Sequence, residues 1–421
     1  MRSRLRCRTL AVYLLAAALA ACAGLAGDVH AHGEAAQEAF LRMSTIQWYD
    51  TRWSASEVNV NDEIVVTGRF HVARYWPFNV PKPEMTFLNV GVPGPVFVRV
   101  ASDIGGVNAA ASMPLELGHD YEYRLVLRAR KPGRYHVHPM LDIRDAGPIV
   151  GPGSWVTVNG SFATFTDPIT TSGGVTVDLE RYGLGWVVGW HVVWLVLALL
   201  WLVYWLRKPL LIPRYEAVVQ GEGEALITPT DRVMGGVMLA AASVIALVAT
   251  GMASVRYPVT IPLQSNQAYP RSLRDTLPTV NVAVTRAEYQ IPGRTVRMWL
   301  TVTNSGAEPV RLGEFTTANI RFLNRQVVQP ESGYPDDLLA PAGLEVIPDV
   351  AVEPGQTRDL EVVATSVAWE TERLALLIKD PTSRIGGLLM FFGSQSNRRQ
   401  VVEVSSPVIP TFRGELTGVE S

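Results

Sequence analysis

Cysteine is scarce in this sequence. Its 421 residues include only Cys7 and Cys22, and both lie near the N-terminus. If that segment is removed on export, the remaining chain has no disulfide, no thiolate metal ligand and no cysteine nucleophile. Any metal held by the remaining chain would need histidine, carboxylate, methionine or backbone nitrogen as its ligand.

Charge is scarce as well. Charged residues make up 18% of the chain, against about 25% in soluble domains. The formal net charge is −2 and no basic block occurs, which argues against nucleic acid as a partner. Hydrophobic residues reach 48%, and the length allows roughly two or three domains. These features indicate a folded protein with a membrane component.

The first 31 residues read as an export signal. Arginines near the start precede an apolar stretch from about Leu10 to Leu19, and Val29-His30-Ala31 fits a small-residue cleavage site. Cleavage after Ala31 would make His32 the new N-terminus. A competing interpretation remains open, because Leu19-Ala20-Ala21-Cys22 resembles a lipoprotein box with cleavage before a lipidated Cys22.

Two long apolar runs predict transmembrane helices. Trp186–Leu206 has 21 residues and Val233–Val255 has 23, each enough to cross a hydrocarbon layer of ~30 Å. The connecting loop, residues 207–232, has Lys and Arg next to both predicted helices, which marks the cytoplasmic side. We therefore expect both flanking regions on the periplasmic side, in agreement with a cleavable signal.

Those flanking regions predict β-domains. Short strand-like runs separated by Gly, Pro, Asn and Asp turns fill residues 32–180, and residues 256–421 repeat this style. No histidine follows His191. The second domain therefore has neither His nor Cys and cannot house an ordinary blue-copper centre.

Tyr135-His136-Val137-His138 is the main chemical feature. It follows a Pro-Gly turn and reads as a strand, so His136 and His138 point to one face. A terminal His32 would add its amine and ring, giving up to four nitrogen donors, a set that favours Cu(II). The alternative is a polar strand face with His32 in a frayed terminus.

The other candidates are weaker. His71 fits a packed or surface strand position, His119 lies in a turn, and His191 fits interfacial placement or contact with a partner inside the first apolar run. Asp336 and Asp337 follow Gly-Tyr-Pro and predict a turn.

Several motifs together resemble the B subunit of the copper membrane monooxygenases, the family of particulate methane monooxygenase, ammonia monooxygenase and their short-chain hydrocarbon relatives. The similarity covers essentially the whole mature chain. The motifs are His32-Gly33-Glu34, Ile46-Gln47-Trp48-Tyr49-Asp50, Phe87-Leu88-Asn89-Val90-Gly91, Pro93-Gly94-Pro95-Val96-Phe97, His136-Val137-His138, Gly147-Pro148-Ile149-Val150-Gly151-Pro152-Gly153, Tyr257-Pro258-Val259-Thr260-Ile261-Pro262-Leu263, Arg311-Leu312-Gly313-Glu314-Phe315 and Gly333-Tyr334-Pro335-Asp336-Asp337-Leu338-Leu339.

The resemblance implies a mainly β protein with two cupredoxin-like β-sandwich domains on the periplasmic side, joined by two transmembrane α-helices. It implies assembly with membrane subunits A and C, as a trimer of heterotrimers, in a bacterial inner or intracytoplasmic membrane. It also implies copper at His32, His136 and His138. Some members carry a histidine before Trp-Tyr-Asp for a second copper site, and this chain has Gln47 there.

The reaction that the family implies inserts one oxygen atom of O₂ into a strong C–H or N–H bond while two electrons reduce the other atom to water. Three alternatives stay open at this stage. The chain could be a copper-bearing scaffold with catalysis in a partner, a periplasmic copper carrier, or a structural lipoprotein tethered through Cys22. Methane, ammonia and short-chain alkanes are not distinguished.

Overall fold

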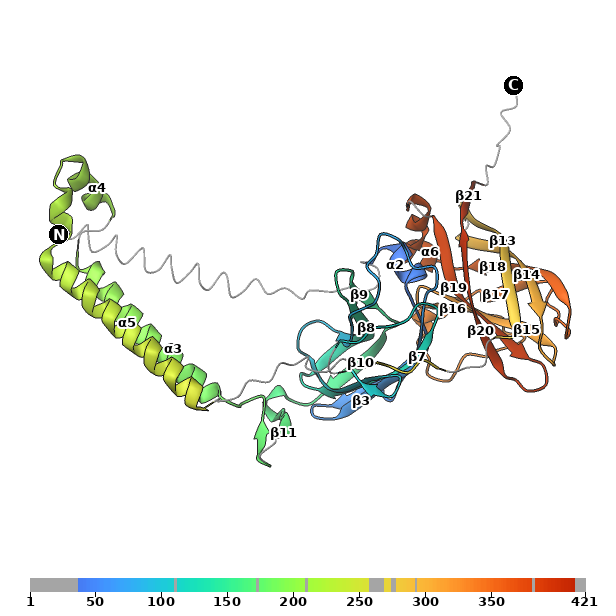
Figure 1. Cartoon of the computed structure of the whole chain (residues 1–421), viewed down its shortest axis with the longest axis horizontal. Helices are drawn as coiled ribbons and strands as arrows, with labels where there is room; N and C mark the ends of the chain where they lie inside the picture. Colours follow the sequence, from blue (N-terminus) through green and yellow to red (C-terminus); the bar gives the residue numbers. More distant parts are fainter. Residues whose placement is uncertain are drawn as a thin grey trace, which may run out of the picture. The chain divides into compact units, whose positions relative to one another are not determined.

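The computed structural model describes residues 37–109, 112–171, 174–208, 211–256, 269–273, 278–291, 294–380 and 383–412. The predicted signal segment and His32 lie outside these residues. The chain forms two compact units (Figure 1), one from residues 1–164 and 266–421 and the other from residues 165–265. The first unit contains two β-domains, and the second contains the long helices.

The N-terminal β-domain has two facing sheets. One has the strand order β1-β3-β7-β5-β6, and the other has the order β2-β10-β8-β4 with β9 paired to β8. The strands are β1 (Ile46–Trp53), β2 (Glu57–Asn59), β3 (Glu63–Val72), β4 (Thr86–Gly91), β5 (Phe97–Ile104), β6 (Val107–Asn108), β7 (Asp120–Ala129), β8 (Gly133–Ile143), β9 (Gly147–Val150) and β10 (Ser154–Asn159), followed by the short 3-10 helix η1 (Phe162–Thr164).

Alternating side chains build the core of this domain. Along β7, Tyr121, Tyr123 and Leu125 are buried while the residues between them face outward, as expected for strands with one face in a core. The rings of Tyr121 and Tyr123 gather around Phe70 at centroid distances of 5.5 and 6.2 Å. This aromatic cluster is the largest apolar mass under the first sheet.

The C-terminal β-domain is a second sandwich. Its sheets have the orders β17-β18-β14-β13-β21 and β16-β15-β19-β20. The elements are β13 (Val280–Ile291), β14 (Thr295–Asn304), β15 (Val310–Thr317), β16 (Ile320–Leu323), η3 (Asp336–Leu338), β17 (Leu344–Ile347), β18 (Thr357–Thr365), α6 (Ala368–Thr371), η4 (Leu374–Lys379), β19 (Arg384–Gly393), β20 (Arg399–Pro407) and β21 (Ile409–Phe412).

The N-terminal segment ties the two β-domains together. Helix α2 (Ala39–Ser44) precedes β1, yet Ala39 and Met43 belong to the hydrophobic core of the C-terminal domain. The approach to β19 is close, because a Cβ added at Gly386 would meet the Met43 carbonyl oxygen at 2.3 Å. Glycine is therefore needed there for packing. The pattern of local apolar residues did not reveal this long-range contact.

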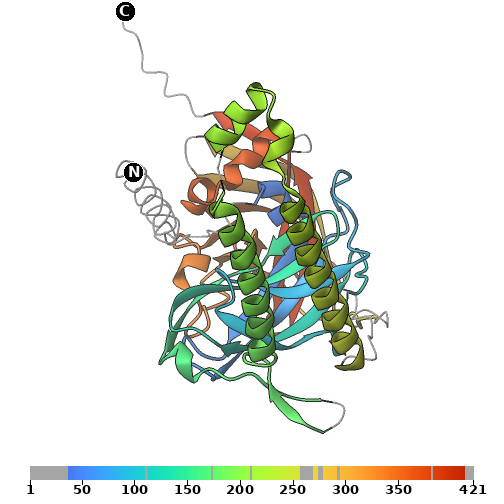
Figure 2. The ribbon, with the colours of Figure 1, turned by 90° about the vertical axis from the view of Figure 1, so that its left-hand side faces the viewer.

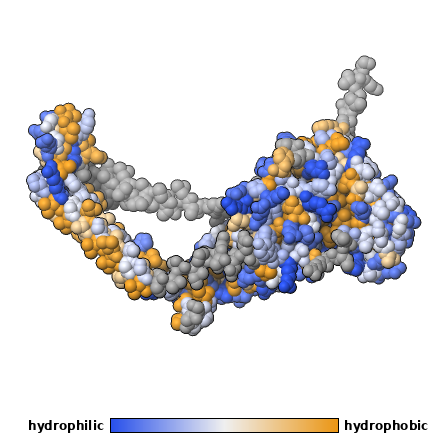
Figure 3. Space-filling model, in the orientation of Figure 1, coloured by the Kyte–Doolittle hydropathy of each residue, from blue (hydrophilic) through white to orange (hydrophobic). Residues whose placement is uncertain are grey.

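The helical unit contains two long antiparallel helices that lie side by side (Figure 2). Both are long and apolar enough to cross a membrane by length and composition, and Figure 3 shows their hydrophobic surfaces. A mainly β protein with two apolar helices is the predicted fold, which is confirmed. The elements are β11 (Pro168–Thr170), β12 (Thr176–Asp178), α3 (Leu184–Leu206), α4 (Leu211–Val219), η2 (Gly223–Leu226) and α5 (Pro229–Arg256).

The start of α5 is stabilised by a carboxylate. Asp231 accepts hydrogen bonds from the backbone N–H of Thr228, at 2.8 Å, and from the side chains of Tyr204 and Lys208 at the end of α3. An acid in the first turn also interacts favourably with the helix dipole. These contacts join the two long helices at the ends that flank the connecting segment.

Candidate metal centre

Strand β8 brings the two predicted histidines together. It lies between β10 and β4, with His136 opposite Trp155 and His138 opposite Gly91. Because side chains alternate along a strand, both imidazoles project from one face. Their ring centroids are 4.3 Å apart and the ring planes are nearly perpendicular, at 85°. Two neighbouring imidazoles can thus converge on a single ion.

His138 is held in one orientation. Its side chain is buried, and its Nδ1 lies 3.0 Å from the carbonyl oxygen of Gly151. A carbonyl oxygen only accepts hydrogen bonds, so Nδ1 must carry the proton and Nε2 must carry the lone pair. A metal-binding histidine is commonly oriented by this kind of hydrogen bond. The ring also lies directly over Gly153, where an added Cβ would meet His138 Cε1 at 2.3 Å.

His136 is packed between an aromatic ring and a carboxylate. Its ring lies 4.9 Å from the Trp155 ring, with an angle of 30° between the planes. Its Nε2 is buried and lies 3.9 Å from Asp337 Oδ2 of the C-terminal domain. Asp337 lies in η3, so its turn follows the sequence prediction, whereas its proximity to His136 was not predicted. No local sequence signal connects positions so far apart.

The two imidazoles fit a nitrogen-ligated metal, and they leave the ligand set incomplete. Among the residues that the structure describes, no group of three His, Cys, Asp or Glu side chains could hold a metal ion. The third predicted ligand, His32, lies outside the described residues. Gln37 is described, and its side chain accepts a hydrogen bond from Val150 N–H at 3.0 Å and donates one to the Pro148 carbonyl.

These contacts of Gln37 fix where the chain enters. Val150 directly precedes Gly151, whose carbonyl oxygen orients His138. Five residues separate His32 from Gln37, and five residues span at most ~17 Å when extended. The chain length is therefore compatible with a third ligand from His32.

His71 has a different role. Its Nε2 lies 3.1 Å from Glu403 Oε2 of the C-terminal domain, and its Nδ1 lies 3.2 Å from Asp120 Oδ2, an ion-pair distance without hydrogen-bond alignment. Burial opposes the charged form, but the two carboxylates outweigh it and raise the pKa of His71 to about 9. A protonated imidazole has no lone pair for a metal. His71 is an interdomain ion pair.

Gln47 supports that assignment. It lies opposite His71 in the β1–β3 ladder and is buried, and its amide donates a hydrogen bond to the Met43 carbonyl. Both residues are thus engaged in packing between the domains. The sequence did not identify the partners of His71, because Glu403 is 332 positions away.

The remaining predicted positions lie elsewhere. His119 is in a turn, with its Nδ1 3.2 Å from the Leu117 carbonyl. His191 lies in α3, where its Nδ1 is 2.8 Å from the carbonyl of Val187 one turn earlier. Each histidine thus has a local backbone partner.

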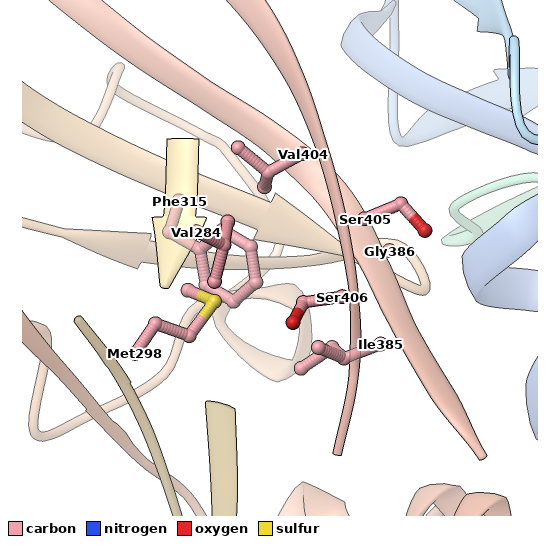
Figure 4. A pocket seen from close by; sticks show the side chains of 8 residues that line it. All are labelled: Val284, Met298, Phe315, Ile385, Gly386, Val404, Ser405 and Ser406. Carbon is pink, nitrogen blue, oxygen red and sulfur yellow. The ribbon is translucent and has the colours of Figure 1, made fainter. Parts of the chain in front are cut away.

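An apolar pocket in the C-terminal domain offers no alternative site of chemistry. Figure 4 shows Val284, Met298 and Phe315 gathered together, with the Ser405 side chain pointing away from them. The space measures about 160 Å³ and its lining contains no histidine, acid or base. The lining residues are Val284, Met298, Phe315, Ile385, Gly386, Val404, Ser405 and Ser406.

Comparison with known proteins defines the class. The family model for the B-subunit protein of the monooxygenases matches residues 33–412, and the chain belongs to this family. It is a subunit of a membrane monooxygenase.

The individual matches are consistent with this assignment. The chain is 47% identical over 399 residues to the particulate methane monooxygenase alpha subunit of Methylococcus capsulatus (strain ATCC 33009 / NCIMB 11132 / Bath), covering 94% of this chain and 96% of that protein. The cupredoxin domain of amoB from Nitrosocaldus yellowstonii matches with 20% identity and a TM-score of 0.24, over 29% of this chain and 91% of that structure.

Proposed function

We propose that this chain is the copper-binding B subunit of a membrane-bound monooxygenase that hydroxylates methane with O₂ and two electrons. The proposed copper ligands are His32, His136 and His138. The observation that carries the proposal is the convergence of His136 and His138, with ring centroids 4.3 Å apart on one strand.

Each described histidine has a defined task in this proposal. His138 presents Nε2, because its Nδ1–H is bound to the Gly151 carbonyl. His136 presents its ring beside His138, supported by the face of Trp155. His32 supplies its ring and, after cleavage of residues 1–31, its free amine. Copper would supply the ability to bind O₂ and to change oxidation state in a nitrogen-rich site.

The topology follows from the two long helices. We propose that α3 and α5 cross the bilayer with residues 207–232 on the cytoplasmic side, which places residues 32–180 and 256–421 in the periplasm. Arg207 and Lys208 at the end of α3, with Arg232 at the start of α5, support this orientation. The proposed partners are the lipid bilayer and membrane subunits A and C, in a trimer of heterotrimers.

Methane is the proposed substrate because the Methylococcus relative is named for it. Ammonia or a short-chain alkane is the alternative, and oxidation assays with all three on purified membranes separate them. A rate with methane far above the rates with ammonia and propane supports the proposal. A preference for either of the others overturns this choice of substrate.

The copper proposal is tested with His136→Ala and His138→Ala in the membrane complex. Copper per protomer and substrate oxidation are measured together, and His119→Ala serves as a control histidine in a turn of the same domain. Both variants should lose copper and oxidation, while the control keeps both. Unchanged copper in the two variants would overturn the site.

The assay also separates catalysis from a scaffold role. If copper is lost and oxidation survives, this chain is a copper-bearing scaffold and the reaction occurs in a partner. If the isolated chain transfers copper to another protein without any oxidation in the complex, it is a carrier. The two-domain architecture with α3 and α5 favours membership of a complex, since a carrier needs only one β-domain.

A further inference from the structure

A turn of the C-terminal domain reaches the candidate metal centre. This domain contains neither histidine nor cysteine, so its contribution to such a centre must come from another group. In η3, Asp337 Oδ2 lies 3.9 Å from the buried Nε2 of His136. The carboxylate therefore approaches one of the two described imidazoles of the site from the opposite domain.

The segment that carries Asp337 is anchored by a buried arginine. Arg321 makes two hydrogen bonds to Glu314, at 2.7 and 2.9 Å, and one to Glu331, at 2.8 Å. Its guanidinium also lies 4.6 Å from the centroid of the Tyr334 ring. Beyond the turn, the backbone N–H of Ala340 donates to the Arg321 carbonyl at 2.9 Å. Arg321 thus fixes the segment before and after Asp337.

The second side of the contact is equally constrained. His136 lies in the middle of a sheet, and its ring lies close to the rings of Trp155 and His138. Nε2 is the nitrogen that faces the carboxylate. If Nε2–H donates to Asp337, the lone pair is on Nδ1, which is then the nitrogen that can ligate a metal.

The geometry points to Asp337 as a positioning residue for the metal centre, acting through His136. This inference rests on the proposed copper site. A carboxylate that accepts a hydrogen bond from a metal-bound histidine fixes the tautomer and ring orientation and increases the basicity of the ligand. The present distance is that of an ion pair, and the side chain of Asp337 is 56% exposed. It therefore has room to close to hydrogen-bond distance.

The magnitude follows from this exposure. Removal of a carboxylate partner of a metal-bound histidine typically costs 10–100-fold in metal affinity. Water screens a half-exposed carboxylate, so we expect the lower end, about tenfold. Asp337 does not touch the proposed copper itself, so copper still binds when its concentration is high.

The test compares Asp337→Asn with Asp336→Asn in the membrane complex. Both variants remove one negative charge from the same turn, but only the first removes the carboxylate next to His136. Copper affinity is measured by competition with a chelator, and the Cu(II) electron paramagnetic resonance spectrum reports the ligand geometry. Thermal unfolding of the copper-free complex checks that both variants are folded. Asp337→Glu serves as the conservative variant.

The expected result is a copper affinity about tenfold weaker and an altered Cu(II) spectrum for Asp337→Asn, with Asp336→Asn like the unmodified protein and Asp337→Glu in between. Equal affinities and spectra for the two asparagine variants would overturn the inference. This failure is distinct from failure of the copper site itself, because in that case His136→Ala would also leave the copper content unchanged.

Discussion

The orientation of His138 makes Gly153 the most sensitive position near the proposed copper site. A Cβ at this residue would lie 2.3 Å from His138 Cε1, 2.6 Å from Nδ1 and 2.7 Å from Nε2. Ordinary contacts begin at 3.4 Å, so the ring would have to move by about 1 Å. The contact involves the body of the ring and cannot be relieved at a flexible end. We therefore predict that Gly153→Ala displaces the imidazole.

Two costs follow from that displacement. The hydrogen bond from Nδ1–H to the Gly151 carbonyl is weakened in a buried place, which costs about 1–3 kcal/mol. Overpacking a closely packed site costs about 1–3 kcal/mol when neighbours must shift. Because the same hydrogen bond aims Nε2, copper affinity should fall by at least about tenfold, the lower end for outer-shell changes.

Gly91→Ala is a matched control. Gly91 lies opposite His138 on the neighbouring strand, and its added Cβ would meet His138 Cβ at 3.4 Å, an ordinary contact. Copper per protomer and thermal unfolding are measured in the membrane complex for both variants. Gly153→Ala should lose copper and Gly91→Ala should retain it. If Gly153→Ala retains as much copper as Gly91→Ala, the described position of His138 does not govern binding.

Three further predictions concern the interdomain ion pair, the buried arginine and the N-terminus. The pKa of His71 is higher in the folded protein, about 9 against 6.5, so its stabilisation relative to His71→Gln, at most about 3 kcal/mol, should be full below pH 6.5 and vanish as pH rises through 9; a difference in unfolding temperature that is constant from pH 6 to 10 would refute this. Glu314→Gln should cost about 3 kcal/mol, because it weakens a buried ion pair of Arg321. Replacing both residues with leucine and methionine should restore much of that loss in denaturation experiments, and no recovery would contradict it. Mass spectrometry should find the mature chain starting at unmodified His32, whereas a lipidated Cys22 would rule out the amine ligand.

The local parts of the fold could be predicted from the sequence because they depend on local patterns. The run Glu63–His71 predicted a strand, and β3 spans Glu63–Val72. Val296–Val302 alternates cleanly and lies within β14. The first apolar run gave α3 to within two residues at its start, because a membrane-spanning length of apolar residues is a strong signal.

The remaining features depend on contacts between distant positions. The packing of α2 in the core of the C-terminal domain, the Glu403 partner of His71 and the approach of Asp337 to His136 all join two β-domains. No periodicity encodes such pairings, because each partner alone looks like an ordinary surface or core residue. The His136-x-His138 pair was visible in the sequence because strand geometry alone places both rings on one face.

The most direct test of the copper site is an anomalous difference map, recorded at the copper absorption edge from crystals of the membrane complex. Our account predicts a peak within bonding distance of His138 Nε2 and of a ring nitrogen of His136. A copper-loaded complex with no peak next to these two imidazoles would contradict it.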